Sequence, residues 1–273
     1  MISPFVDKLA NAVERNSSLL CVGLDPDPAL MPIEDVAAFN RAIIEATSDL
    51  VCAYKPNLAF YEALGESGWA ALRATLAAIP PGLVVIADAK RGDIGNTADA
   101  YARAILDNLG ADALTVNAWG GRDSIEPFVK RSDKGVFIWC RSSNPGAGDL
   151  QDLLVQEDGA RPLWQALAMR AQEWNTSGNI GLVMGATYPE QLGQARALCP
   201  DLPILVPGVG AQQGDLEASV RAGLDREGRG ILVAVSRQVI FASKGADFAA
   251  AARATAQRLR DEINRYRTAL ATS

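Results

Sequence analysis

Charged side chains gather in one segment of the chain, residues 83–97, which reads LVVIADAKRGDIGNT. A run of aliphatic residues leads there into Asp88, Lys90, Arg91 and Asp93. Side chains alternate along a strand, so Asp88 and Lys90 are predicted to share one face. Burying such charges is costly unless they are paired. The segment is therefore either an ion-pair network or a functional site.

Two further charged residues, Asp25 and Lys55, also follow strand-like runs. For any one pair of charges, a structural ion pair and an acid–base site both remain open. A lysine flanked by carboxylates stays protonated, because opposite charges favour its charged form. Such a lysine suits a proton donor. It does not suit a Schiff base, which requires a neutral amine to attack a carbonyl.

A second set of residues is typical of phosphate binding: Gly208-Val209-Gly210 and Ser236-Arg237. Glycines let backbone N–H groups approach an anion closely, and arginine can bind phosphate through two parallel hydrogen bonds. The alternative is a turn followed by a surface arginine. We favour the phosphate site. The segment GVGAQQG at 208–214 departs from the dinucleotide fingerprint, so no Rossmann cofactor site is expected.

Composition excludes several classes of function. The chain has no histidine, which rules out Ser-His-Asp and Cys-His catalysis and removes the commonest transition-metal ligand. Its formal net charge is −6 and no basic stripe is apparent, so a nucleic-acid polymer is not an expected partner. The apolar runs are strand-length, far below the roughly 20 residues that a membrane span needs.

The cysteines and the N-terminus point to a reducing compartment. The four cysteines are scattered and form no CxxC pair, so we expect buried, reduced thiols and a cytoplasmic protein: Cys21, Cys52, Cys140 and Cys199. Residues 1–16 are typical of an amphipathic helix that carries acidic residues, and not of a signal peptide.

Strand-like and helix-like segments alternate along the whole chain. The expected strands are rich in Val, Ile and Leu, as in parallel sheets covered on both faces: 19–24, 51–55, 83–88, 113–117, 135–140, 180–184, 204–207 and 231–235. Ala-rich amphipathic stretches follow them: 34–49, 66–79, 96–109, 122–131, 161–176, 188–198, 213–223 and 246–270. Eight such units predict a (β/α)₈ TIM barrel, an α/β fold, and we expect one domain over residues 1–273.

The strand exits carry the unusual residues. In a barrel these ends meet on one face, where active sites are built. The connection after the fifth strand runs to about residue 160, a length typical of a mobile lid.

Local patterns add two smaller expectations. Asn96, with Asp99 three residues later, resembles a helix N-cap. Tyr54, Trp119 and Trp139 are expected to pack around the barrel and not to bind a base.

The segment DAKRGDIGNT at 88–97 resembles the DxKxxDI-xxT signature of the orotidine 5′-phosphate decarboxylase family. Other motifs match that family in the same order: Lys55 in YKPN, SNPG at 143–146, PGVGAQ at 207–212, and Arg237. The resemblance extends from Asp25 to Arg237 and is closest to the longer bacterial branch. The DxKxxD element alone is shared with a wider group of barrels, whereas the combination is specific.

The resemblance implies decarboxylation of orotidine 5′-monophosphate to UMP, the last step of de novo pyrimidine synthesis, with no metal and no organic cofactor. It implies that Lys90 protonates C6 of the pyrimidine as carbon dioxide leaves. Asp88 would lie against the substrate carboxylate. Lys55 and Asp93 would complete the charge array.

The resemblance also implies a set of substrate contacts. They are Asp25 and Lys55 at the ribose hydroxyls, Ser143 at the amide edge of the pyrimidine, Gln212 at the phosphate and lid region, and Arg237 at the phosphate. Pro207 and Ser236 lie in the motifs next to the phosphate. Ser236 departs from the family pattern, in which a glycine often precedes this arginine.

The same resemblance predicts a homodimer. Asp93, Ile94 and Thr97 would reach into the site of the partner subunit. Asp93 would therefore serve the neighbouring site and not its own.

Three alternatives remain open. A magnesium-dependent sugar-phosphate lyase or aldolase uses the same barrel, but its relatives carry a glutamate where this chain has Lys55, which would repel a divalent cation. A Schiff-base aldolase would form a trappable imine. A non-catalytic barrel would bind UMP without turnover.

Overall fold

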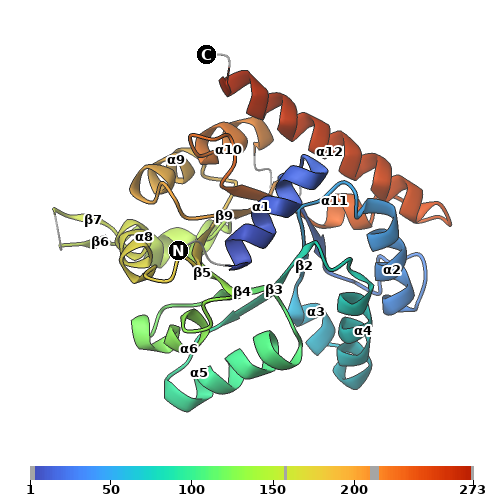
Figure 1. Cartoon of the computed structure of the whole chain (residues 1–273), viewed down its shortest axis with the longest axis horizontal. Coiled ribbons are helices and arrows are strands. Elements are labelled where there is room, and N and C mark those ends of the chain that lie inside the picture. The colour runs from blue at the N-terminus through green and yellow to red at the C-terminus, as the bar shows by residue number, and fades with distance from the viewer. Residues whose placement is uncertain (1–3, 157–158, 210–214, 272–273) are drawn as a thin grey trace.

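Parallel strands form a closed ring at the centre of the protein. The computed structural model describes residues 4–156, 159–209 and 215–271. Within these residues, eight parallel strands close into a barrel in the order β1-β10-β9-β8-β5-β4-β3-β2 (Figure 1). Neighbouring strands pair in register, for example Leu20 with Val233 and Cys21 with Ala53. The predicted (β/α)₈ barrel is confirmed.

The barrel strands are short and apolar. Their bounds are β1 Leu20–Leu24, β2 Ala53–Pro56, β3 Val84–Arg91, β4 Ala113–Val116, β5 Gly135–Arg141, β8 Ile180–Met184, β9 Ile204–Pro207 and β10 Ile231–Val235. Every residue of β1, β8 and β10 is buried, as expected for strands packed on both faces. The largest departure from expectation is β3, which runs past residue 88 to Arg91.

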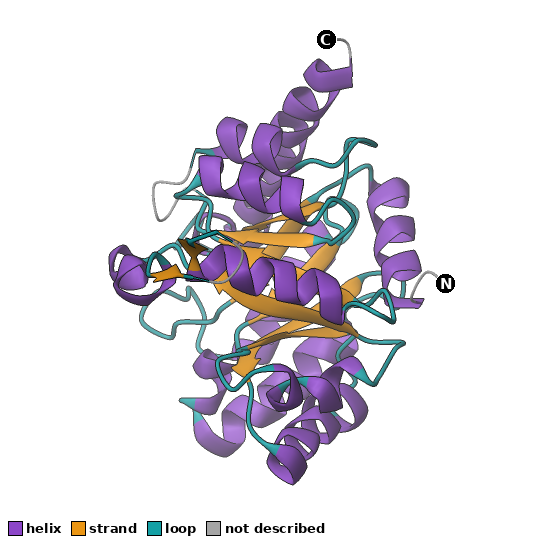
Figure 2. Ribbon diagram, turned by 90° about the vertical axis from the view of Figure 1, so that its left-hand side faces the viewer, coloured by secondary structure: helices purple, strands orange, loops and turns teal. Residues whose placement is uncertain are grey.

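Helices surround the strands on all sides (Figure 2). The longer ones are α1 Pro4–Asn16, α2 Val36–Thr47, α4 Gly65–Ala78, α5 Gly95–Ala102, α8 Leu163–Trp174, α9 Pro189–Leu198, α10 Leu216–Gly223 and α12 Phe248–Ala271. The shorter ones are α3 Leu58–Glu62, α6 Glu126–Val129, α7 Gly148–Gln151 and α11 Arg237–Ile240. In the described parts of the chain, none of the helices has the length and apolarity to cross a membrane.

Some expected helices are interrupted. The helix expected at 96–109 is α5 followed by a π-helical segment, Arg103–Asn108. The one expected at 122–131 consists of a 3₁₀ turn, Arg122–Ser124, and α6. The long connection after β5 holds a 3₁₀ turn, Pro145–Ala147, then α7 and an antiparallel pair, β6 Leu154–Val155 with β7 Arg161–Pro162.

The N-terminal helix closes one end of the barrel. Figure 1 shows α1 lying across the centre of the ring of strands. Phe5 of α1 is buried and meets Phe137 edge-on, with ring centroids 5.9 Å apart. A Cβ at Gly135 would lie 2.5 Å from the Phe5 ring, so the glycine at this position leaves space for that ring. The amphipathic N-terminal helix is confirmed, and it leaves the opposite, carboxyl end of the strands open for a site.

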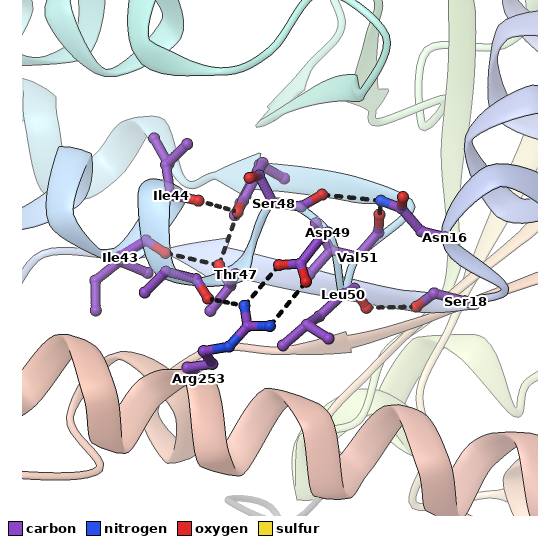
Figure 3. Close-up of polar contacts among 12 residues, drawn as sticks. Asn16, Ser18, Ile43, Ile44, Thr47, Ser48, Asp49, Leu50, Val51 and Arg253 are labelled. Atoms are coloured by element: carbon purple, nitrogen blue, oxygen red, sulfur yellow. Dashed lines mark hydrogen bonds and ion pairs between the residues drawn. The ribbon is translucent and has the colours of Figure 1, made fainter.

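The C-terminal helix holds the segment that leads into β2 (Figure 3). Arg253 of α12 donates to the carbonyl of Ala46 at 2.7 Å and to both carboxylate oxygens of Asp49 at 2.6 and 2.8 Å. From the other side, Asn16 donates to the carbonyls of Ser48 and Val51 at 2.8 and 2.7 Å. These contacts fix the start of the strand that carries Lys55.

Two local expectations were wrong. Asn96 is not the N-cap of α5: Ile94 occupies the cap position and makes no side-chain cap bond. Trp119 does not pack in the core, because its side chain is 74% exposed. Tyr54 is fully buried as expected, and Trp139 is partly buried against the core. Trp119 was misjudged because the sequence cannot show whether an apolar residue after a strand faces the barrel or another surface.

All four cysteines are buried and free, as expected. Burial raises the pKa of Cys21 to about 12 and that of Cys199 to about 11. These thiols therefore stay protonated near neutral pH and act as small apolar residues.

The buried side chain of Arg196 bonds the segments that lead into β9 and β10. The side chain of Arg196, in α9, donates to five backbone carbonyls at 2.7 to 3.0 Å: those of Cys199, Pro200, Leu202, Gly223 and Gly230. Burial lowers the pKa of Arg196 from its ordinary value, although Asp225 opposes this effect. The guanidinium thus satisfies carbonyls from the turns on either side of β9.

We predict that Arg196→Met lowers the free energy of unfolding by about 3 kcal/mol, because the carbonyls lose a charged donor while the side-chain volume is kept. Urea unfolding followed by circular dichroism measures the change. The control is Arg221→Met, which removes an exposed partner of Glu217 and should cost at most about 0.5 kcal/mol. Equal effects of the two variants would contradict a structural role for Arg196.

Candidate active site

The carboxyl end of the barrel holds a cavity of about 540 Å³. Most of the residues predicted for the site line this cavity: Asp25, Lys55, Asp88, Lys90, Ser143, Pro207, Ser236 and Arg237. They come from the ends of six different strands, which only the closed barrel brings together. The predicted convergence of the strand exits is confirmed.

A carboxylate bridging two ammonium groups lies in this cavity. Asp88 accepts from Lys55 Nζ through Oδ2 at 2.9 Å and from Lys90 Nζ through Oδ1 at 2.6 Å. The side chain of Lys55 is 7% exposed, whereas that of Lys90 is 37% exposed. Lys55 is thus a buried member of the network, and Lys90 is the ammonium that a ligand in the cavity can reach.

Thr115 of β4 fixes this geometry, and sequence reasoning missed it. Its hydroxyl donates to Asp88 Oδ1 at 2.9 Å and accepts from the backbone N–H groups of Ala89 and Lys90 at 3.0 and 2.9 Å.

The backbone of β3 is irregular beside Thr115. The pairing of β3 with β4 shifts register between Ala87 and Arg91. Lys90 has a φ of +46°, which is rare for a residue with a side chain. Backbone strain of this kind is typical of functional sites. The regular alternation of side chains, from which we predicted that Asp88 and Lys90 share one face, therefore ends at this register shift. Both residues still line the cavity.

Charge pairing controls ionisation in the site. Burial alone would raise the pKa of Asp88, but the charges and hydrogen bonds of Lys55 and Lys90 outweigh it and hold that pKa well below its usual range. Burial alone would lower the pKa of Lys55, but Asp88 and Asp25 outweigh it and raise that pKa above its usual value. The carboxylate and the buried ammonium therefore stay charged near neutral pH.

Two buried oxygens in the cavity have no hydrogen-bond partner among the described residues: Asp25 Oδ1 and Ser236 Oγ. Buried polar atoms are normally paired, so these two are candidates for ligand contacts. Ser236 also explains a glycine in β1, because a Cβ at Gly23 would lie 2.7 Å from the Ser236 Cβ. The serine that departs from the family pattern is thus accommodated by Gly23, and its φ of −115° lies outside the left-handed region that favours glycine.

The expected phosphate residues lie at one side of the cavity. Pro207 is the last residue of β9, and Gly208 and Val209 follow it; Arg237 follows β10, the neighbour of β9 in the barrel. Gly208 has a φ of +95°, a conformation that favours glycine. Gly210 and Gln212 lie outside the described residues.

The remaining predicted residues do not line the cavity of this chain. Asp93 accepts a hydrogen bond from the N–H of Ile94 at 2.7 Å, and Ile94 is 67% exposed. Thr97 is also exposed, in the first turn of α5. The backbone turns away here because Gly92 packs against Asn117: a Cβ on Gly92 would lie 2.0 Å from its carbonyl oxygen. Within one subunit, then, these three residues stand apart from the charged network.

Trp139 and Arg141 are among the cavity residues to which the sequence reasoning assigned no role in the site. Trp139 of β5 lines the cavity, and its ring centroid lies 5.8 Å from Lys90 Nζ. Arg141, at the end of the same strand, also lines it. Their positions two residues apart on β5 were the available signal. In the described parts of the chain, carboxylates and thiols form no group of three or more that could hold a metal ion.

We predict that the difference in unfolding free energy between the native chain and Asp88→Asn depends on pH below about 4. Because the folded pKa of Asp88 is depressed, its contribution is complete above the unfolded pKa of about 4 and is lost as pH falls. Lys55 adds no change in this range, since its raised pKa acts only in alkali. Urea unfolding from pH 7 to 3 should show a constant difference above pH 5, then a decline of about 1 kcal/mol between pH 4 and 3. A difference that stays constant or grows in acid would contradict the assignment.

Known proteins resemble this chain over most of its length. The model of the orotidine 5′-phosphate decarboxylase / HUMPS family matches residues 18–254. An orotidine 5′-phosphate decarboxylase of Thermomicrobium roseum is 54% identical over 98% of this chain and 97% of its own.

Solved structures are similar as well. An OMP decarboxylase of Leishmania donovani is 44% identical with a TM-score of 0.86, over 97% of this chain and 98% of its own. A UMP synthase of the same organism is 46% identical with a TM-score of 0.88; the match covers 98% of this chain but 57% of that one. The chain belongs to the orotidine 5′-phosphate decarboxylase / HUMPS family.

Proposed function

We propose that this protein decarboxylates orotidine 5′-monophosphate to UMP and carbon dioxide in pyrimidine synthesis, with Lys90 as the proton donor to C6. The observation that carries the proposal is the Asp88 carboxylate held between a buried Lys55 and an accessible Lys90 in the barrel cavity. The family match and the names of the full-length relatives support the same reaction.

In the proposed reaction, the bond between C6 and the carboxylate breaks and its electron pair stays on C6. Carbon dioxide leaves, and a proton moves from Lys90 Nζ to C6. A fixed ammonium beside C6 stabilises the charge that develops there more than it stabilises the bound substrate, which lowers the barrier. Asp88 lies against the substrate carboxylate, and this like-charge contact is relieved as carbon dioxide leaves.

The other cavity residues hold the nucleotide. Arg237 and the loop at Pro207 bind the 5′-phosphate, with Gln212 and Ser236 completing that end. Asp25, whose Oδ1 has no hydrogen-bond partner among the described residues, binds a ribose hydroxyl together with Lys55. Ser143 contacts the amide edge of the pyrimidine. Binding energy from the phosphate, remote from the reacting carbon, can then be used to assemble the charged site.

A homodimer would complete each site. Ile94 and Trp119 are 67% and 74% exposed, on the adjacent loops after β3 and β4. These loops touch, since the N–H of Asp93 donates to the carbonyl of Ser124 at 3.3 Å. Exposed apolar side chains of this kind mark association surfaces. We propose that a second copy packs here and that Asp93, Ile94 and Thr97 enter its cavity.

Neither a metal nor an organic cofactor is required in the proposed reaction, because the protein's own ammonium supplies both charge and proton. Within the magnesium-dependent alternative, Lys55 would occupy the place of a carboxylate ligand and repel the ion. We further propose a cytoplasmic location, which the four free thiols support.

We predict that the purified protein consumes orotidine 5′-monophosphate at the same rate with and without EDTA. The loss of substrate absorbance measures this rate.

We also predict that Lys90→Ala lowers kcat by at least about 10³-fold, because both the proton donor and the stabilising charge are lost. UMP should still bind. The control is Lys130→Ala, an exposed lysine paired with Glu126, which should keep native activity. Near-normal turnover by Lys90→Ala would refute the proton-donor role, and inhibition by EDTA would favour the magnesium-dependent alternative.

We predict that inactive Lys90→Ala and Asp93→Ala proteins regain activity when they are mixed. If Asp93 serves the partner's site, a hybrid dimer has one intact site and one doubly altered site. Random exchange at equal concentrations should restore about a quarter of native activity. If Asp93 served its own subunit, every site in the mixture would stay defective, and the mixture would be inactive. Each protein incubated alone is the baseline.

A further inference from the structure

Arg141, at the end of β5, is almost fully buried and is bonded through all three guanidinium nitrogens. It is 2% exposed. Its Nε donates to Gln191 at 2.6 Å, its Nη1 to Gln151 Oε1 at 3.0 Å and its Nη2 to Asp152 at 3.1 Å. The guanidinium also stacks over the ring of Tyr188, 4.2 Å from its centroid. Arg141 therefore joins the connection after β5, which contains Gln151 and Asp152, to the start of α9.

Gln151 links this arginine to the wall of the cavity. Its Oε1 accepts from Arg141 Nη1 and also from the backbone N–H of Ser142 at 2.9 Å. Ser142, Ser143 and Asn144 all line the cavity. One amide oxygen thus holds the backbone directly before Ser143, and the buried guanidinium fixes the position of that oxygen.

The loop after β8 contacts the same backbone. Gly185 donates its N–H to the carbonyl of Arg141 at 2.9 Å. A Cβ on Gly185 would lie 2.8 Å from the backbone nitrogen of Ser143, so the two backbones are in direct contact. Thr187 Oγ1 donates to the carbonyl of Ser143 at 3.3 Å. The wall at residues 142–144 is therefore clamped between Gln151 and the loop at 185–187.

We propose that Gln151, oriented by Arg141, is a positioning residue for recognition of the pyrimidine. This inference rests on the proposed function, in which Ser143 contacts the base. Gln151 does not itself line the cavity. It acts by holding the Ser142–Asn144 backbone in the conformation that receives the base, so the ordering cost is met before the ligand binds. The phosphate and ribose residues lie on other strands and do not depend on this clamp.

The test compares two ligands in two variants. Gln151→Leu keeps the side-chain size but removes the shared acceptor, whereas Gln151→Glu retains an acceptor oxygen. We expect Gln151→Leu to weaken UMP binding about tenfold, the effect of about 1.4 kcal/mol, and to raise KM for orotidine 5′-monophosphate similarly with a smaller change in kcat. Binding of ribose 5-phosphate, which lacks the base, should change less than about twofold. Gln151→Glu should recover UMP binding to within about threefold of native.

Gln165→Leu is the matched control. It removes an exposed hydrogen bond between the side chains of Gln165 in α8 and Gln194 in α9, away from the cavity. It should bind both ligands as the native chain does. Unchanged UMP binding in Gln151→Leu would overturn the inference, and so would an equal loss of both ligands, which indicates a general structural defect. If the native chain itself neither binds UMP nor decarboxylates the substrate, the proposed function fails, and the inference fails with it.

Discussion

The bridging of two lysine ammonium groups by the Asp88 carboxylate is the interaction on which the site depends. A carboxylate at this depth would be costly without partners, and so would the buried ammonium of Lys55. Each group makes burial of the others tolerable, and together they keep a charged array in the cavity. Because Asp88 already neutralises Lys55, the more exposed Lys90 remains available to a ligand.

The barrel provides what this array needs. Its partners come from β2 and β3, and the Thr115 hydroxyl from β4 holds Asp88 and two backbone N–H groups at once. That bond sits at the register shift where Lys90 adopts a φ of +46°. Phe5 packs against Phe137 at the opposite end of the barrel, and the cavity that holds the charged array lies at the carboxyl end.

The two ends of the proposed ligand are held by different kinds of structure. In the proposed complex, the phosphate end rests on residues at or directly after the ends of β9 and β10: Pro207, Gly208, Ser236 and Arg237. The base end rests on the long connection after β5, which has little core of its own and is fixed by a buried arginine and a glutamine. A connection of that length can take many conformations, so side-chain bonds must select one. This contrast explains why a cavity wall depends on Gln151, which does not line it.

Sequence alone determined the alternation of strands and helices, the closed barrel and the identity of the charged strand exits. Apolar periodicity and local residue types carry that information, and parallel strands with both faces covered leave few other folds. It also singled out Asp88, Lys90, Lys55 and Arg237, which line the cavity, because charges after buried strands are unusual in any fold. The tertiary structure decided the bulge at Lys90, the role of Thr115, the exposure of Trp119 and the clamp at Gln151. Each of these depends on which strand or loop lies alongside, and contacts between residues distant in the chain leave no periodic signal in it.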